Sequence, residues 1–327
     1  MRQEKVKQLI AEAWPRFDVV IAKELTEAGI GEKLRSEAVR LGILSRLRRG
    51  AYVRTDLWQN CSTRANDLMR IRAHFLTTPH TGAYSHVTAA RLLGLHVWDV
   101  PPTIHLTQNF SSSRISSGAD TRTYNQQFAP NEVVKIPGPR GGKYPVTSPE
   151  RTVVDCARTL ELHRAVIVGD HALREGADRE VIASMLAAMG GKRGISKARS
   201  AFRLMDSRAE SPGETRTRLL FNTFGITMPE SQPALISRLG KHRGDFAWRD
   251  IRLIAEFDGK GKYFDYKPTD QAIYQERERE KALMEEDWTF FRIGWRDLSE
   301  PEALKARLLT AMAKAAAWTQ ARGAAAK

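Results

Sequence analysis

The chain has 327 residues, with 52 Lys and Arg against 38 Asp and Glu, which gives a formal net charge of +14 and a sequence pI of about 10.0. This length supports roughly two or three domains, each with its own core. The apolar fraction of 42% and charged fraction of 28% are those of a globular protein and exclude a disordered acidic chain. The positive charge favours a polyanionic partner, foremost nucleic acid, although it also serves solubility.

The cysteines and the apolar runs bear on the compartment. Cys61 and Cys156 lie far apart without CxxC spacing, so neither a disulfide framework nor a zinc ribbon is expected. The first twenty residues mix acids and bases and lack the apolar segment of a signal peptide. No apolar run approaches the ~20 residues that cross a bilayer. We therefore expect a cytoplasmic protein that does not enter a membrane.

The N-terminal segment has a helix–helix–hairpin pattern. Apolar residues recur at helical spacing over 20–28, before Gly29, and a second helical pattern over 32–41 ends at Gly42. Two apolar strand-like runs within 43–53 flank a basic turn, which predicts a β-hairpin. Two helices followed by a basic hairpin is the plan of a winged helix-turn-helix, whose second helix enters the major groove of DNA while the hairpin contacts phosphates.

The same segment is basic. Between Ile30 and Arg54, seven basic residues stand against two acidic ones, a local charge of +5. The candidate DNA-binding residues are Lys33, Arg35, Arg40, Arg46, Arg48, Arg49 and Arg54. If about five phosphates were neutralised, log K would fall with log salt at a slope of about −4.5. The alternative is a small helical subdomain with a solvated arginine face.

The middle segment, residues 80–205, alternates helical and strand-like patterns and predicts a mixed α/β domain. A strand is expected over 103–107, and Ser148 followed by Pro149 predicts a capped helix that reaches Leu160. The histidines of this segment lack metal-ligand spacing and are expected to serve packing or the surface. They are His86, His96, His105, His163 and His171.

The C-terminal segment, residues 206–327, holds a candidate acidic site. Strands are predicted over 244–248 and 252–257, and their pairing as a hairpin would bring Asp245 close to Glu256. Asp258 shares the face of Glu256, because residues two apart in a strand point the same way, and Lys260 is next if the strand continues.

Converging carboxylates hold hard divalent cations such as Mg²⁺ and leave positions for water and a phosphate oxygen. Such an ion, Mg²⁺ or Mn²⁺, activates water and stabilises charge during in-line attack on phosphate. The pattern in a basic protein therefore indicates phosphodiester hydrolysis. An ordinary hairpin with charges on its solvated side, turning at Asp258 and Gly259, remains the alternative.

The acidic residues of this segment stand in recognisable motifs. Glu214 lies in SPGET, Asp245 in GDFAW, Glu256 and Asp258 in AEFDGKGKY, and the segment closes with FRIGWRDL. This series resembles the very-short-patch-repair-like endonucleases of the PD-(D/E)XK superfamily, which have a mixed sheet flanked by helices. The resemblance implies that Asp245 and Glu256 bind metal and that Glu214 is a further acidic group.

This chain departs from the superfamily pattern at one position. The motif places Lys two residues after the second acid, where this chain has Asp258, with Lys260 two residues further on. Lys260 would replace the missing lysine and stabilise the transition state, or Asp258 would be a third metal ligand.

The upstream part of the chain has a second resemblance. LSRLRRGAYV and SHVTAARLLGL resemble the N-terminal winged helix and following region of AbiEi-type antitoxins, which repress their own operons. We expect an α+β protein of three parts: a winged helix over 1–79, a mixed α/β domain over 80–205 and an endonuclease-like domain over 206–327. Its expected partner is double-stranded DNA. The alternative is a non-catalytic repressor that binds its own promoter and a toxin protein.

Overall fold

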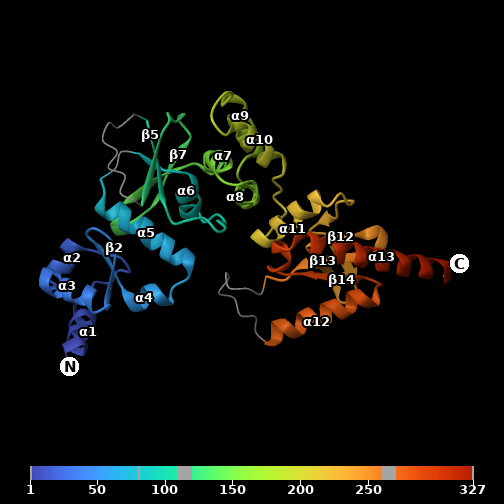
Figure 1. Ribbon diagram of the computed structural model, residues 1–327, viewed down its shortest axis with the longest axis horizontal. Coiled ribbons are helices and arrows are strands. Elements are labelled where there is room, and N and C mark those ends of the chain that lie inside the picture. Colours follow the sequence, from blue (N-terminus) through green and yellow to red (C-terminus); the bar gives the residue numbers. More distant parts are fainter. Residues whose placement is uncertain (1, 80–81, 110–119, 260–269, 326–327) are drawn as a thin grey trace. The chain divides into compact units, whose positions relative to one another are not determined.

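The computed structural model describes residues 2–79, 82–109, 120–259 and 270–325 (Figure 1). Over these residues the chain is mixed α/β and forms two compact units, Met1–Cys156 and Ala157–Lys327. These bounds differ from the expected three-part division at 79/80 and 205/206, which stays a prediction. None of the described helices combines the length and the apolar character needed to cross a bilayer.

The first unit begins with helices packed on a small antiparallel sheet of strand order β1-β3-β2. The elements are α1 (Arg2–Ala13), β1 (Val20–Ile21), α2 (Ala22–Glu27), α3 (Glu32–Arg40), β2 (Leu44–Arg48) and β3 (Ala51–Arg54). The second predicted helix and the hairpin are confirmed. The first predicted helix begins two residues late, because Val20 and Ile21 pair with Tyr52 and Ala51 in β3. β-Branched residues favour such pairing.

The rest of the first unit is a five-stranded mixed sheet, order β6-β5-β4-β8-β7, with helices around it. The elements are α4 (Thr55–Asn60), α5 (Thr63–Thr77), β4 (Ala83–Tyr84), α6 (His86–Leu92), β5 (Ile104–Gln108), β6 (Thr121–Asn125), β7 (Val133–Pro137), η1 (Pro139–Gly141), β8 (Lys143–Thr147) and α7 (Pro149–Thr159). The predicted strand and capped helix are both present. The Ser148 hydroxyl accepts a hydrogen bond from the Arg151 backbone N–H at 3.2 Å, as an N-cap does.

Arg140 joins the two parts of the first unit. Its guanidinium donates to both carboxylate oxygens of Glu24 in α2 at 2.8 Å, and it lies 3.5 Å from the centroid of the Phe17 ring. It also donates to the backbone carbonyl of Val19 at 2.8 Å. Bidentate pairing adds geometric specificity to attraction. The helices at the N-terminus are therefore held against the strands that follow residue 80.

The second unit opens with helices and continues into a four-stranded mixed sheet, order β14-β13-β12-β9, and a separate hairpin, β10-β11. The helices are α8 (Leu162–Arg174), α9 (Arg179–Ala188), α10 (Ile195–Arg203), α11 (Pro212–Thr223), α12 (Asp270–Glu285) and α13 (Pro301–Ala325), with the short turns η2 (Arg249–Ile251) and η3 (Asp297–Ser299). The strands are β9 (Glu230–Ser231), β10 (Ala234–Ser237), β11 (Gly240–Arg243), β12 (Phe246–Trp248), β13 (Leu253–Phe257) and β14 (Thr289–Ile293).

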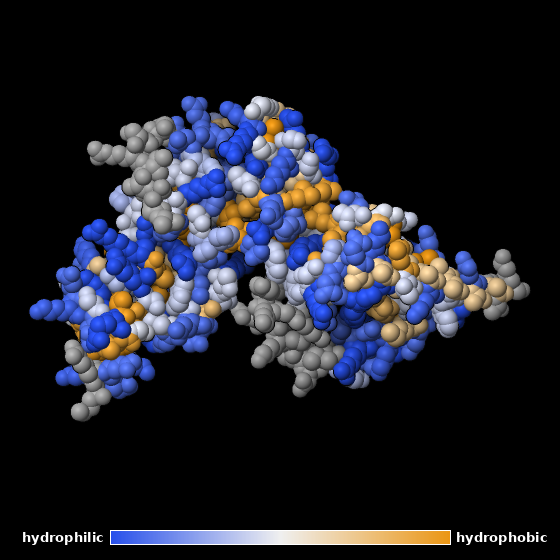
Figure 2. Space-filling model, viewed as in Figure 1, coloured by the Kyte–Doolittle hydropathy of each residue, from blue (hydrophilic) through white to orange (hydrophobic). Residues whose placement is uncertain are grey.

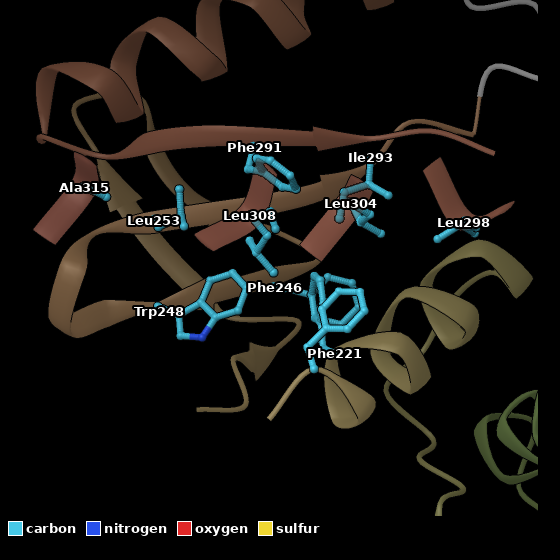
Figure 3. Packing of buried hydrophobic residues seen from close by; sticks show 12 residues of the cluster. Phe221, Phe246, Trp248, Leu253, Phe291, Ile293, Leu298, Leu304, Leu308 and Ala315 are labelled. Carbon is cyan, nitrogen blue, oxygen red and sulfur yellow. The ribbon is translucent and has the colours of Figure 1, made fainter. Parts of the chain in front are cut away.

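Alternation along these strands separates two faces of the sheet. One face packs against α11 and α13 and carries the large core shown in Figure 3, including Phe246, Trp248 and Phe291. The other face carries Ala247 and Ile254, which pack with Leu235 of β10 and Leu283 of α12. Strands covered on both faces have apolar residues in both alternating sets. Each residue of these strands therefore points either to the face covered by α11 and α13 or to the face covered by α12.

The alanine-rich C-terminal segment forms α13, a helix of 25 residues, as its helix propensity predicts. Leu304, Leu308 and Ala315 are buried in the core of the second unit. Figure 2 shows light-orange side chains along the outer part of this helix, at the right of the view. Trp318, in the same helix, is 54% exposed.

Candidate active site and nucleic-acid interface

Asp245 and Glu256 lie opposite each other at one end of the β12–β13 pair. The strands are antiparallel with Phe246 opposite Ala255, so the next position on each strand brings Asp245 opposite Glu256. Asp245 shares the face of Ala247, and Glu256 that of Ile254. The two carboxylates therefore occupy the α12 side of the sheet, with the hairpin register that the sequence predicts.

Glu214 reaches the same end of the sheet from the first turn of α11. The Ser211 hydroxyl caps this helix by accepting the Glu214 backbone N–H at 3.1 Å. The Glu214 carboxylate accepts hydrogen bonds from the Glu210 backbone N–H at 2.9 Å and from the Gln232 side-chain amide at 2.8 Å. These contacts fix the orientation of the Glu214 side chain.

The close approach of α11 to β13 depends on Gly213. A Cβ atom built on Gly213 would lie 2.0 Å from Cε1 of Phe257, far inside van der Waals contact. The Phe257 ring also packs edge-on against Trp295, with centroids 4.9 Å apart. Gly213 thus permits the contact that sets the neighbouring Glu214 beside the sheet acids.

The pKa values of Asp245 and Glu214 are both raised. Burial, and after it the negative charges of Glu214 and Glu256, raise the pKa of Asp245 to about 7. The Phe257 backbone N–H, which donates to Asp245 Oδ2 at 2.7 Å, opposes this rise. Burial likewise raises the pKa of Glu214. We call Glu214, Asp245 and Glu256 the acidic cluster.

Two arginines bind Glu256. An Arg279 Nη donates to Oε1 at 2.7 Å from α12, and Arg292 Nη1 lies 2.5 Å from Oε2. Arg292 is the register partner of Glu256 in the parallel β13–β14 pair. Arg279 also binds Glu276 at 2.6 Å, and Arg292 also binds Glu280 at 3.0 Å. Each arginine therefore has a second carboxylate within reach.

The remaining predicted site residues lie differently. Asp258 follows β13, is exposed, and its backbone N–H donates to the carbonyl of Ile293 at 2.7 Å. Lys260 lies outside the described residues. Sequence reasoning missed Gln232, Arg279 and Arg292, although the alternation of TFFRI, paired with β13, marks Arg292 as a neighbour of the second acid.

Asp245 and Glu256 are two carboxylates on one face of the sheet, and both oxygens of Glu256 are bound by Arg279 and Arg292. Among the described residues, no group of three or more His, Cys, Asp or Glu has an arrangement that could hold a metal. Mg²⁺, however, is commonly bound through one or two carboxylates, with water and phosphate oxygens as the other ligands. Burial is the main cause that raises the pKa of Asp245, and a cation would relieve the second cause, repulsion from Glu214 and Glu256.

The seven basic residues of the N-terminal segment divide by exposure. Lys33, Arg40, Arg46 and Arg49 are exposed, whereas Arg35, Arg48 and Arg54 are partly buried. Arg40 pairs with Glu37 at 2.7 Å, and Arg54 pairs with Asp56. Within the described part of the chain, Lys33, Arg46 and Arg49 have no carboxylate partner. Figure 2 shows hydrophilic side chains over α2 and α3.

A β-bulge separates Arg46 from Arg48. Arg46 pairs with Tyr52, but Arg48 pairs with Ala51, because the register shifts between them. Adjacent residues of β3 point to opposite faces, so Arg46 lies on the Tyr52 face and Arg48 on the other. Arg35 lies on the same side as Arg46, with its guanidinium 5.4 Å from the Tyr52 ring centroid. Arg48 instead lies 3.6 Å from Asp120.

Comparison with known proteins gives relatives without an assigned activity. No protein-family profile matches the chain. The uncharacterized proteins MT2308 and Rv2248, from two strains of Mycobacterium tuberculosis, are each 34% identical to this chain over 165 residues. The match covers 50% of this chain. The chain thereby spans 59% of the length of each relative.

Among solved structures, the RV2827C protein from Mycobacterium tuberculosis is similar with a TM-score of 0.38 and 15% identity. The likeness covers 72% of this chain and 88% of that one.

Proposed function

We propose that the protein is a Mg²⁺-dependent endonuclease that hydrolyses phosphodiester bonds in double-stranded DNA. The observation that carries this proposal is the acidic cluster, in which Asp245 lies opposite Glu256 and its pKa is raised to about 7. A buried group of like charges is unfavourable for folding and is characteristic of catalytic and metal sites.

In this proposal Asp245 and Glu256 hold the ion. The metal, Mg²⁺ or Mn²⁺, supplies an activated water and neutralises charge on the phosphoryl group. The negative charge of Glu214, in the first turn of α11, raises the affinity of Asp245 for a cation. Lys260 stabilises the transition state, and Asp258 completes the acidic surface next to β13.

The N-terminal elements supply DNA binding. The order of one helix, a short strand, two further helices and a hairpin fits a winged helix-turn-helix, with α3 as the helix that enters the major groove. The exposed Lys33, Arg46 and Arg49 contact phosphates. Arg35 and Arg40 extend this basic surface, while Arg54 pairs with Asp56 beside it.

A plasmid-cleavage assay tests the catalytic proposal. The protein is incubated with supercoiled DNA and Mg²⁺ or Mn²⁺, and Asp245→Ala and Glu256→Ala are expected to abolish cutting. Asp250→Ala is the matched control, because Asp250 is an exposed acid in the turn between the same strands and is expected to leave cutting unchanged. Cutting that persists in both site variants would overturn the assignment.

The second candidate is a non-catalytic, antitoxin-like repressor on an endonuclease-type scaffold. It is favoured by the two arginines that bind both carboxylate oxygens of Glu256, and by Asp258 at the position where the superfamily has lysine. A footprint of the protein on its own promoter, together with the absence of cutting in any metal, would select this function. Copurification with a toxin protein would support it further.

A further inference from the structure

A basic pocket lies in the second unit, apart from the acidic cluster. It has a volume of about 350 Å³ and is formed by the start of α9, the end of α10 with the segment that follows, and α11. Four of its lining residues are Arg179, Arg203, Arg208 and Arg218. Leu219 and Met228 contribute an apolar part of the wall. The pocket therefore combines several guanidinium groups with an apolar surface.

The charges of this pocket are not balanced by its own acids. Asp206 is the carboxylate among the lining residues, and it pairs with Arg208 at 2.7 Å. Arg179 donates to the Met205 carbonyl at 3.1 Å, and Arg203 donates to the Ser200 hydroxyl at 3.2 Å. Neither of these two arginines has a carboxylate partner in the described part of the chain. An anion would relieve their mutual repulsion.

Arg218 is held in the wall by two hydrogen bonds. It donates to the Leu204 carbonyl and to Asp170 Oδ2, each at 2.7 Å. Asp170 is fixed in turn by the Asp206 backbone N–H at 2.7 Å. The Arg218 Nε is buried and has no hydrogen-bond partner among the described residues. The guanidinium of Arg218 is therefore fixed in position, with 11% of the side chain exposed.

We propose that this pocket binds a nucleotide through its phosphate group. Arginine presents paired donors that match phosphate oxygens, and a fixed guanidinium at Arg218 with exposed ones at Arg179 and Arg203 can surround such an anion. Leu219 and Met228 offer the base and sugar an apolar surface. A free mononucleotide and the phosphorylated end of a strand present this same chemistry. The site does not depend on hydrolysis at the acidic cluster.

Calorimetric titration in the presence of EDTA, which prevents cleavage, tests this inference. The probes are adenosine 5′-monophosphate, adenosine, inorganic phosphate, and a short single strand with or without a 5′-phosphate. Arg179→Ala and Arg203→Ala are each expected to weaken binding of the phosphorylated probes about tenfold, because each removes charge-assisted hydrogen bonds. Arg203→Lys should retain part of the affinity.

Arg296→Ala is the matched control, since this exposed arginine of the same unit pairs with Glu300 and lies outside the pocket. Tight binding of both phosphorylated probes supports the proposal, and binding of the phosphorylated strand alone assigns the ligand to a strand end. The proposal is overturned if neither phosphorylated probe binds, or if the variants bind like the parent protein. It is also overturned if adenosine monophosphate binds no more tightly than inorganic phosphate and, in addition, the 5′-phosphate makes no difference to binding of the strand.

Discussion

Arg292 stands directly opposite Glu256 in the parallel pairing of β14 with β13, and its guanidinium lies 2.5 Å from the carboxylate. Together with Arg279 it supplies positive charge at the position where a metal ion is proposed. The two arginines and a cation therefore compete for the same carboxylate oxygens. Glu276 and Glu280 are close enough to receive the arginines when an ion binds.

Replacing Arg279 should reduce stability. Arg279→Gln leaves the buried Glu256 with Arg292 as its cationic partner, and we expect the free energy of unfolding to fall by about 2 kcal/mol. Denaturant unfolding measures this change. Arg238→Gln is the control, because Arg238 binds Glu285 of the same helix α12 in an exposed pair and should cost less than about 1 kcal/mol. Equal losses in both variants would contradict the role given to Arg279.

Stability should depend on the ionisation of Asp245. Its pKa is about 7 in the folded protein and 3.8 in the unfolded reference, so the folded state binds the proton more tightly. The contribution of protonated Asp245 to the free energy of unfolding is fully present below about pH 4. It is lost as the pH rises to about 7. Asp245→Asn removes this loss and keeps an oxygen for the Phe257 N–H. The variant should exceed the parent protein by up to about 4 kcal/mol at pH 8, and the gap should shrink at pH 5.

Magnesium binding can be detected without measuring cleavage. At pH 8, millimolar Mg²⁺ should raise the melting temperature of the parent protein, because a ligand that binds the folded state stabilises it. Asp245→Asn and Glu256→Gln should lose this response, while Asp250→Asn should keep it. A thermal shift with Mg²⁺ that is the same in all four proteins would place the ion elsewhere.

Gly213 should tolerate no larger side chain. In Gly213→Ala the new Cβ would force the Phe257 ring to move, and overpacking of this kind costs about 1 to 3 kcal/mol. Gly259→Ala is the matched control near the same ring, since its Cβ would meet Phe257 at an ordinary 3.8 Å. Thermal unfolding compares the two. A harmless Gly213→Ala would mean that α11 is not held against β13 by this contact.

The bulge in the N-terminal hairpin predicts unequal effects of two neighbouring arginines on DNA binding. Arg46→Ala removes an exposed cation and should reduce the slope of log K against log salt by about 0.9. Arg48→Ala should leave the slope unchanged, because this side chain is 19% exposed and pairs with Asp120. Fluorescence anisotropy with a duplex of mixed sequence measures both. Equal slopes for the two variants would remove the bulge from the account of DNA binding.

Local patterns predicted much of the geometry of the second unit. Alternation and turn residues gave the β12–β13 hairpin and therefore the opposition of Asp245 and Glu256, because antiparallel register follows from the turn. The position of Glu214 was harder to predict from the sequence, since it depends on how closely α11 approaches the sheet. That approach is set by Gly213 and Phe257, which are 44 positions apart in the chain.

Other features could not be derived from local pattern. Val20 and Ile21 fit a helical stripe, but they pair with β3, a tertiary contact that overrides the local preference. Arg48 fits a basic hairpin as well as Arg46 does, and only the bulge separates them. The contact of Arg279 with Glu256 depends on the rotation of α12 about its axis, which charge alternation in EREREK leaves undetermined.

The missing side chain at residue 213 also has a use in design. Anyone who transplants these carboxylates onto another scaffold must carry over the dipeptide Gly213-Glu214 as a unit, because the bare backbone of the first residue determines where the second can reach. Grafting the three carboxylates alone would leave the Glu214 carboxylate too far from those of Asp245 and Glu256.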